Sequence, residues 1–582
     1  MRGLSGARWE ASIMREDESV LDQILESRGI SGAAREAFLN PRIKDALPDP
    51  FFLNGMEAAS RILADAILKG ENVGIYSDYD ADGATSAGVL GRWLRMMGQD
   101  PHDVVIPHRT EHGYGPHAGL LSEMFESGMD KGFILDSGTV ASSVLNTLPE
   151  AQRKALVVID HHMPSGDIPD IAAVVNPNLT NQKPGLGHLA AVGVTFLLCV
   201  AAQRELVKAG HLPQSSMQSL MELLDYVAIG TVCDVVPLVG VNRAFVYHGL
   251  QRIQRTETNP IGALLKAAGR SLDAPVQSSD CGFVIGPRLN AEGRIGDPRA
   301  AAHFLLETDP DLIREGAARL QQTNDKRKGM EKTATETAID DAENFQTAHA
   351  VVAVAEGHVG VVGISASRLK DRYNKPSVVL TKVRDGVLQG SARSVDGFNI
   401  GEAIHEAVDA GLLIKGGGHA MAGGVTIEEK NLDAFRTHLD DASARSDFGK
   451  NGVSTSYDLV LRMKDVSVGL LDSLKKLEPC GRENPEPRFV LKDVRIKDVR
   501  TMSDKHIKLF IPSPERGKDS LDVLMWNGIG TELGNRLLAS KDEVLTLAGR
   551  FEINSYAGKD KVQMIVEDVL ASSGPDTPTP FP

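Results

Sequence analysis

Three short apolar segments in the first half of the chain each end in an acidic residue. They cover residues 73–77, 132–135 and 156–159, and Asp78, Asp136 and Asp160 follow them directly. Short runs this rich in Val, Ile and Leu, with helical patterns between them, predict strands of a parallel sheet that are buried on both faces. Because ligand sites of open α/β sheets lie outside the carboxyl ends of the strands, we expect the three acids at one site.

The first of these strand ends carries a cluster of carboxylates. Asp78, Asp80 and Asp82 precede Gly83. Carboxylates this close repel one another, and a divalent cation that prefers oxygen ligands, Mg²⁺ or Mn²⁺, relieves the repulsion. A solvated acidic turn is the alternative for this motif taken alone. The recurrence of an acid after the other two segments favours a metal site.

Length, charge and cysteine content limit the class of protein. A chain of 582 residues exceeds what one hydrophobic core serves, so several domains are expected. The net charge of −15 argues on its own against a nucleic-acid partner, although binding depends on local positive patches. The four cysteines lack a CxxC spacing and are expected as reduced thiols of a cytoplasmic protein. No apolar segment has the length of a membrane span, and the N-terminus lacks a signal-peptide core.

Several motifs, in a fixed order, carry a family resemblance. Asp80-Ala-Asp82, Asp136, Asp160-His161-His162, Gly230 to Asp234 and the glycine-rich Gly416 to His419 resemble the motifs of the DHH phosphoesterase superfamily and its DHHA1 domain. Further segments narrow the resemblance to the RecJ single-strand-specific DNA exonucleases, over about residues 50 to 570. These segments are Ile106 to Gly115, Ile285 to Arg294, Gly360 to Arg368, Gly390 to Arg393 and Asn484 to Pro487.

The resemblance and the segment composition together predict an α/β fold in several parts. A parallel-sheet DHH domain and a smaller α/β DHHA1 domain would be joined by a long helix, with a C-terminal β-barrel of OB-like type. The polar stretch from Gln321 to Glu336 fits the exposed connector helix. The expected parts are a helical segment at 1–50, the DHH domain at 51–240, a helical region with the connector at 241–345, the DHHA1 domain at 346–450, the OB-like domain at 451–570 and a disordered tail at 571–582.

The resemblance also implies a catalytic centre that holds two metal ions, Mn²⁺ or Mg²⁺. Asp136 would bridge the ions, with Asp82, His161 and Asp234 on one ion and Asp80 on the other. For the histidines taken alone, a packed or surface role is the alternative. The implied catalytic residues are Asp80, Asp82, Asp136, His161, His162 and Asp234.

The chain departs from the superfamily at one expected metal ligand. Many members carry a histidine where this chain has Tyr76, and Asp78 is the expected replacement, directly or through a water. His162 would face the scissile phosphate as a hydrogen-bond donor. Asp160 would orient the two histidines without binding a metal ion itself.

Phosphate recognition is expected from arginines, because the planar guanidinium matches phosphate oxygens. Glycines at 417 and 418 would let backbone N–H groups approach a phosphate beside His419, with a tight structural turn as the alternative. Arg294 and Arg368 are weaker candidates, since an arginine beside a glycine turn is often structural. The expected substrate-binding residues are Arg109, Arg288, Asn290, Arg393, Gly417, Gly418 and His419.

The resemblance implies a metal-dependent exonuclease that degrades single-stranded DNA from the 5′ end to mononucleotides, in DNA repair and recombination. The residues themselves favour only metal-dependent hydrolysis of phosphodiesters. One alternative is a nuclease for short RNA oligomers or cyclic dinucleotides, and the C-terminal β domain counts against it. Another is a catalytically inactive replication scaffold, and the intact acids count against that. The expected partners are single-stranded DNA, in a groove continuing to Lys505, Lys508 and Lys559, and a single-strand-binding protein and a helicase.

Overall fold

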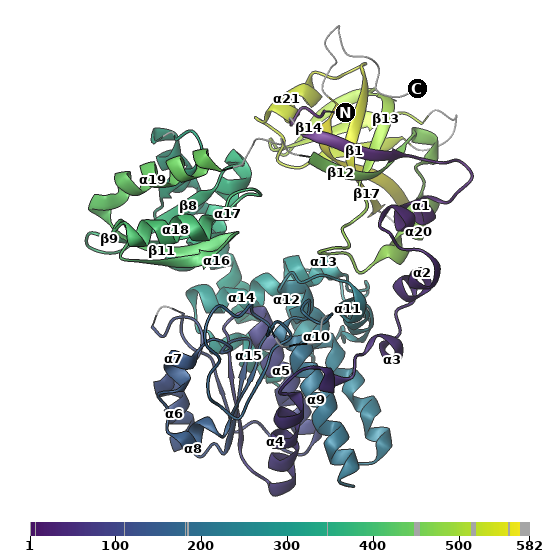
Figure 1. The fold of residues 1–582 in the computed structure, drawn as a ribbon. Coiled ribbons are helices and arrows are strands. Elements are labelled where there is room, and N and C mark those ends of the chain that lie inside the picture. The colour runs from purple at the N-terminus through teal and green to yellow at the C-terminus, as the bar shows by residue number, and fades with distance from the viewer. Residues whose placement is uncertain are drawn as a thin grey trace. The chain divides into compact units, whose positions relative to one another are not determined.

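The computed structural model describes residues 2–5, 7–109, 111–180, 182, 185–345, 347–446, 454–513, 520–556 and 559–570 (Figure 1). These residues form two compact units. The central unit covers residues 43–448 and 481–483, and the terminal unit combines residues 1–42 with 449–480 and 484–582. The predicted tail at 571–582 and the side chain of Lys559 lie outside the described residues. Within the described ranges, no helix combines the length and the apolar character needed to cross a bilayer.

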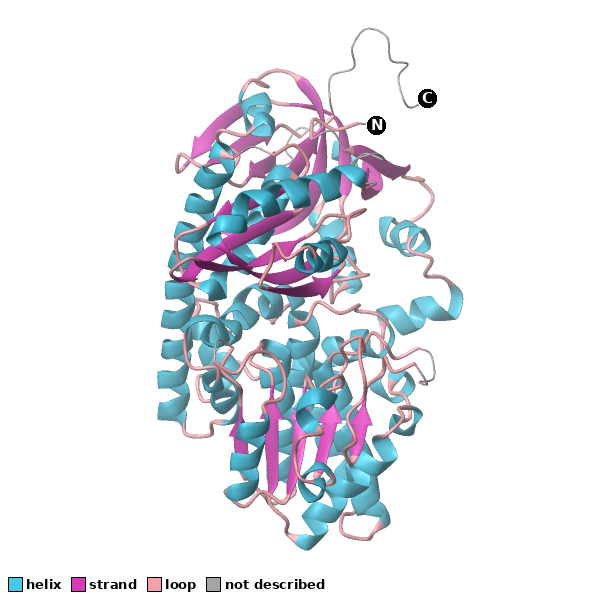
Figure 2. Cartoon of the chain, turned by 60° about the vertical axis from the view of Figure 1, so that its left-hand side comes forward, coloured by secondary structure: helices cyan, strands magenta, loops and turns pink. Residues whose placement is uncertain are grey.

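A parallel sheet of five strands lies in the central unit, as the acid-terminated segments predict (Figure 2). The chain leaves β2 for β3 on one side of the sheet and then returns to β4 on the other side. This reversal opens a crevice at the carboxyl ends of β2 and β4, where open α/β sheets bind ligands. In spatial order the strands are β3 (Asp103–Val105), β2 (Val73–Ser77), β4 (Lys131–Leu135), β5 (Leu156–Ile159) and β6 (Ala173–Val175).

Helices cover both faces of this sheet, which explains why its strands are apolar on both sides. Ile75 and Phe133 pack into one core with α4, α5 and α9. Tyr76 and Ile134 point to the opposite face and pack with α6 and α7. The covering helices are α4 (Met56–Lys69), α5 (Ala81–Met96), α6 (Ala118–Glu126), α7 (Ser142–Leu145) and α9 (Ala191–Lys208).

A helical region follows the sheet and ends in the predicted connector helix. That helix, α16 (Pro310–Asn344), begins with Asp309 as its N-cap and a proline in its first turn. Ile313 and Leu320 pack into the core of the parallel sheet, whereas Ala334 and Ala338 pack into the next core along the chain. One helix therefore joins two cores. The other helices of the region include α10 (Leu224–Cys233), α11 (Gly240–Arg252), α12 (Pro260–Ala267), α14 (Gly286–Ile295) and α15 (Arg299–Leu306).

The second sheet of the central unit is mixed, with β7 and β8 parallel and the other pairs antiparallel. Helices α16 and α17 pack on one face and α18 and α19 on the other. The strands, in spatial order, are β10 (Lys415–His419), β11 (Ala422–Glu428), β9 (Val387–Arg393), β8 (Ser377–Arg384) and β7 (Val351–Val354). The helices are α17 (Val359–Tyr373), α18 (Ile400–Asp409) and α19 (Leu432–Arg445).

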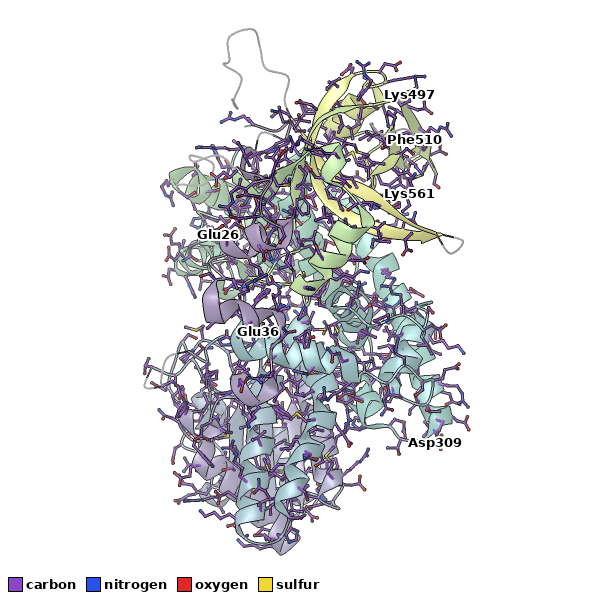
Figure 3. The ribbon with its side chains drawn as sticks, turned by 90° about the vertical axis from the view of Figure 1, so that its right-hand side faces the viewer. Glu26, Glu36, Asp309, Lys497, Phe510 and Lys561 are labelled. Atoms are coloured by element: carbon purple, nitrogen blue, oxygen red, sulfur yellow. The ribbon has the colours of Figure 1, made fainter. Side chains whose placement is uncertain are left out.

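The terminal unit is built on one sheet of eight strands, as the alternating pattern of the C-terminal region predicts. No pairing among the described residues closes this sheet into a full barrel, so the OB-like domain is an open one. Lys497, Phe510 and Lys561 belong to this unit (Figure 3). The strands, in spatial order, are β1 (Arg8–Ile13), β12 (Ser454–Leu461), β13 (Phe489–Arg495), β17 (Val544–Tyr556), β18 (Lys559–Val569), β16 (Leu521–Met525), β15 (His506–Ile511) and β14 (Asp498–Met502).

The N-terminal segment differs from the helical segment predicted for residues 1–50. It does contain α1 (Val20–Ser27), α2 (Gly32–Leu39) and α3 (Ile43–Ala46), but β1 precedes them and pairs in parallel with β12. Trp9 of β1 is buried, and its indole N–H donates to Asp568 at 2.9 Å. The strand is short and its partner lies near the other end of the chain, so local periodicity could not predict the pairing.

Candidate metal centre and phosphate site

The turn after β2 is held in a fixed shape by its own side chains. Asp80 is the N-cap of α5, and its Oδ1 accepts from the N–H groups of Asp82 and Gly83 at 2.9 and 3.0 Å. A Cβ at position 83 would lie 2.4 Å from the carbonyl oxygen of Asp78, so only glycine fits there. Asp82 accepts from the N–H groups of Ala191 and Val192 at the start of α9. The turn therefore presents carboxylates with little freedom to move.

Asp136 ends β4 in a conformation that L-residues rarely adopt. Its φ is +60°, and its N–H donates to the carbonyl of Ile159 in β5 at 2.9 Å. The side chain is buried, and its Oδ1 has no hydrogen-bond partner. Strained backbone around a buried carboxylate is a common feature of functional sites.

Asp160, at the end of β5, organises the two histidines that follow it. Its Oδ1 accepts from the backbone N–H groups of His161 and His162 at 2.7 and 3.1 Å, and it lies 2.8 Å from Nδ1 of His162. Its Oδ2 accepts from the N–H of Thr139 at 3.0 Å. Burial opposes the charge of Asp160, but these hydrogen bonds and the charge of His162 lower its pKa. The geometry agrees with the supporting role expected for this residue.

The imidazole of His161 lies among three carboxylates that come from different elements. Its Nε2 is 3.8 Å from Oδ2 of Asp82, 3.4 Å from Oδ1 of Asp136 and 3.5 Å from Oδ2 of Asp234. Asp234 reaches the cluster as the C-cap of α10. Ligand atoms lie close enough together to share a cation in three sets of residues: Asp82, His161 and Asp234; Asp78, Asp80 and Asp136; and Asp136, His161 and His162.

Several buried polar atoms of the cluster lack a partner, which suits a divalent cation. Oδ1 of Asp78, Oδ1 of Asp136 and Nε2 of His161 are all buried without a hydrogen bond. Such groups are costly to bury unless something compensates them. Carboxylate oxygens with one imidazole nitrogen match the ligand preferences of Mg²⁺ and Mn²⁺. The residues therefore fit the two ions that the sequence implies.

The pKa values of the cluster favour a bound cation. Burial, followed by repulsion between neighbouring carboxylates, raises the pKa of all four aspartates of the cluster. The pKa of Asp82 rises to about 7 and the pKa of Asp234 to about 9, and the pKa values of Asp78 and Asp136 are also raised. Burial and then the charge of His162 lower the pKa of His161 to about 4, so its imidazole is neutral, the form that binds metals. A bound cation would favour the ionised carboxylates.

His162 has a partner that sequence reasoning missed. The hydroxyl of Tyr114 lies 3.2 Å from both ring nitrogens of His162 and 3.5 Å from the carbonyl oxygen of Asp136. Burial opposes charge on His162, but the hydrogen bond and charge of Asp160 raise its pKa to about 9. Partial desolvation of the half-exposed Tyr114, followed by the charge of Asp136, raises its pKa, which keeps its O–H as a donor. The tyrosine stood in a recognisable motif, but nothing in its spacing indicated a role.

Beside the cluster, the charges of neighbouring arginines lower the pKa of Arg294 and Arg393. Burial, followed by the charges of Arg109 and Arg327, lowers the pKa of Arg294 to about 10. Burial and then Arg109 lower the pKa of Arg393. The guanidinium of Arg109 lies 5.4 Å from the ring centre of Tyr79, within the turn that carries the carboxylates. Two predicted arginines, Arg109 and Arg393, are thus brought together with Arg294, which ranked lower, and with Arg327, which was not predicted.

Arg288 and Asn290 sit in structural roles within α14. The guanidinium of Arg288 donates to the carbonyl of Val284 at 2.6 Å and to Oε1 of Gln321 in α16 at 2.7 Å. Oδ1 of Asn290 accepts from the N–H of Ala81 at 2.8 Å, which ties α14 to the start of α5. Both residues hold the framework of the site, and Arg288 has less donor capacity left for a phosphate than Arg294 and Arg393, each of which uses one donor nitrogen in a hydrogen bond. Arg327 is likewise engaged, because it pairs with Glu331 and donates to Asn324.

The glycine-rich motif lies on an open face of the second sheet. Cross-strand pairing aligns His419 with Ala422 and Ala422 with Arg393, so His419 and Arg393 fall in one row. His419 is exposed, and a Cβ at Gly417 would meet no atom within 4 Å. A Cβ at Gly418 would lie 2.3 Å from the carbonyl oxygen of Ala422, so Gly418 is needed for close strand packing. The backbone beside Gly417 is thus accessible to a ligand.

Comparison with known proteins places each part of this chain in a family. The sequence model described as "DHH family, N-terminal domain" matches residues 72–231, "DHHA1 domain" matches residues 346–444 and "RecJ OB domain" matches residues 457–568. The single-stranded-DNA-specific exonuclease RecJ of Bacillus subtilis is 32% identical over 588 residues, covering 98% of this chain and 71% of that protein. The chain belongs to the RecJ family. The RecJ proteins of Dickeya dadantii and Escherichia coli are 33% and 30% identical and are covered over 91% and 97% of their length.

Solved RecJ structures share the fold. The crystal structure of RecJ in complex with Mn²⁺ from Thermus thermophilus aligns over 98% of this chain and 80% of that chain, with a TM-score of 0.79 and 27% identity. A crystal structure of exonuclease RecJ bound to manganese aligns over 69% of this chain with 32% identity and a TM-score of 0.57. Metal-bound relatives with this fold agree with a divalent cation as the cofactor of the acidic cluster.

Proposed function

We propose that this protein is a metal-dependent exonuclease that hydrolyses single-stranded DNA from its 5′ end and releases mononucleotides. The observation that carries the proposal is the set of buried, unpartnered ligand atoms on Asp78, Asp136 and His161 at the crevice of the parallel sheet. Family membership supports the substrate, because the RecJ relatives are named for single-stranded DNA. A role in DNA repair and recombination, a cytoplasmic location and binding to a single-strand-binding protein and a helicase stay predictions.

The ligand sets divide the metal centre into two positions. Asp82, His161 and Asp234 would hold one ion, and Asp78 and Asp80 would hold the other, with Asp136 between them. When bound, two such ions supply an activated water and neutralise charge at the phosphorus. Asp160 would keep the imidazoles oriented throughout.

Two donors beside the metal centre would act on the substrate directly. His162 and Tyr114 would both donate hydrogen bonds to oxygens of the scissile phosphate. Such donors are worth most when they are already in place before the reaction begins. Their mutual contact at 3.2 Å holds them in position.

The clustered arginines would bind the terminal phosphate of the strand. Arg109, Arg294 and Arg393 carry charges that repel one another, and a doubly charged 5′-phosphate would relieve that repulsion. The accessible backbone at Gly417, in the row next to His419 and Arg393, would add N–H donors. Reading a terminal phosphate beside the metal ions would make the enzyme start at the 5′ end.

A direct test compares a 5′-phosphorylated single strand with a dinucleotide, each with and without Mn²⁺. We expect Mn²⁺-dependent release of mononucleotides and faster turnover on the long strand. Preference for the dinucleotide would instead indicate an enzyme for short oligomers, and absence of hydrolysis on both would indicate a non-catalytic role.

A further inference from the structure

A π-helical turn beside the metal centre carries an unusually exposed aromatic side chain. The segment Cys281–Ile285 forms this turn between the short α13 (Ser278–Asp280) and α14. Pro287, just beyond it, has no N–H to donate to the carbonyl of Phe283, so the regular helical pattern cannot continue through this point. The ring of Phe283 is 83% exposed.

The turn is rigid despite its irregular hydrogen bonding. Cys281 and Ile285 are fully buried and anchor it in the core of the parallel sheet. The carbonyl of Val284 accepts from the guanidinium of Arg288, and the carbonyl of Cys281 lies 3.4 Å from Sγ of Cys233. Phe283 is therefore presented to solvent by a well-anchored backbone and is not needed to fill the core.

A cationic cavity opens at the same turn. Its volume is about 190 Å³, and Gly282 and Gly286, on either side of Phe283 in sequence, line it together with Arg294 and Arg327. Cys233, which precedes Asp234, and Asn290, which binds the N–H of Ala81, also line it, so the cavity adjoins the metal ligands. Arg327 pairs with Glu331 and Asn324, which leaves Arg294 as the cation of the cavity for a ligand. An exposed aromatic ring on a turn whose glycines line a cavity with a cation suits a molecule with alternating bases and phosphates.

We propose that Phe283 stacks on an unpaired nucleobase of the strand held at the metal centre, while Arg294 of the adjoining cavity binds its phosphate. The inference rests on the proposed nuclease function and adds a contact with the bases. Stacking on an aromatic ring accepts every base and requires a base whose face is free, as in a single strand. Single exposed apolar residues are common on protein surfaces, but this one occupies a rare, anchored turn whose Gly282 and Gly286 line the cavity that also holds Arg294.

The test measures binding of 5′-phosphorylated oligo-dT strands in which one abasic residue is moved stepwise from the 5′ end. Protein variants are compared in a His162→Ala background, which slows hydrolysis but keeps all the carboxylate ligands and His161, and binding is read before the strands are cut. In the parent, we expect an abasic residue at one position to weaken binding about tenfold, the range typical of base stacking. Phe283→Ala should weaken binding of the intact strand by a similar factor and lose the sensitivity to that position. Phe283→Trp should keep both.

Phe51→Ala is the matched control, because Phe51 is also exposed and lies in the short helix Pro50–Phe52, which packs with α4 and α9. It should leave the abasic profile unchanged. An unchanged profile in Phe283→Ala, with its unfolding temperature equal to that of the parent, would overturn the inference. If the wild-type protein neither binds nor cuts single strands, the proposed function itself fails, which is a distinct result.

Discussion

At the residue scale, Asp136 is the side chain on which both proposed metal positions would depend. It lies 3.4 Å from the His161 imidazole of one ligand set and belongs to the other set with Asp78 and Asp80. Its left-handed backbone and the unpartnered Oδ1 of its buried side chain fit a residue fixed in place to hold a cation.

Asp136→Ala should abolish hydrolysis, because neither ion would be held correctly. Metal assistance supplies several kcal/mol, so we expect a loss on the order of 10³-fold or more in turnover at saturating Mn²⁺. Asp130→Ala, an aspartate preceding β4, serves as a control for surface charge. Near wild-type turnover by Asp136→Ala would contradict the bridging role.

Asp78 tests the ligand that replaces the missing histidine at the position of Tyr76. Asp78→Asn should weaken one metal position and leave the other, so activity should fall and recover partly at high Mn²⁺. A metal titration measures this directly, with one of two sites shifted. If both metal sites keep their affinity, Asp78 only shapes the turn and does not bind a metal ion.

At the element scale, α14 carries two arginines with different surroundings. One supports the framework of the site, and the other lies where a phosphate is expected to bind. Arg288 joins the π-helical turn to α16, whereas Arg294, from the end of α14, lies among the charges of Arg109, Arg327 and Arg393. The sequence could not distinguish these roles, because both arginines stand in the same motif. What differs is the surroundings: Arg288 donates to Gln321 and Val284, whereas Arg294 lies among other arginines.

Arg288→Ala should therefore lower the free energy of unfolding by about 1.5–3 kcal/mol, since hydrogen bonds from a charged group are lost and a carbonyl is left without its donor. Its effect on turnover should be the same for 5′-phosphate and 5′-hydroxyl strands. Arg393→Ala should instead cost more on the 5′-phosphate strand, with little change in stability. Chemical denaturation and turnover on the two strands measure the difference. The reverse pattern would indicate instead that Arg288 binds the terminal phosphate.

The elements that the sequence predicted best are those whose signals are local. Asp78, Asp136 and Asp160 could be placed together because each ends a buried strand of a parallel sheet. The connector helix α16 followed from its polar stretch. Tyr114 and β1 could not be predicted, because a tyrosine in a loop and a short strand find their partners through the tertiary fold. The domain boundaries predicted within the central unit stay predictions.

At the scale of the whole molecule, the two ends of the chain form one unit, and this unit carries basic side chains around an aromatic ring although the net charge of the protein is −15. On β15, the ring of Phe510 lies 4.9 Å from the guanidinium carbon of Arg500 and 5.0 Å from Nζ of Lys508. Lys508 and Lys561 both pair with Asp522. Cations around an aromatic ring on an OB-like sheet are typical of single-strand binding.

Removing the terminal unit should weaken binding to long strands far more than to short ones. Because β1 pairs with β12, the truncation must remove residues 1–42 together with the C-terminal part, leaving 43–448. Binding to long and short single strands over a salt series measures the effect, with log K expected to fall by about 0.7 per phosphate contact. The shortened protein must first be shown to be folded and loaded with metal. Equal affinity of both proteins for a long strand would assign the unit to protein partners.

The position of the first cut tests the proposed function most directly. A long single strand labelled at its 5′-phosphate is mixed with the Mn²⁺-loaded protein, and the products of the earliest turnovers are separated by size. Because the arginines would bind the terminal phosphate beside the metal ions, the label should appear at once as a mononucleotide. A label that remains on progressively shorter strands, or on internal fragments, would contradict an exonuclease that begins at the 5′ end.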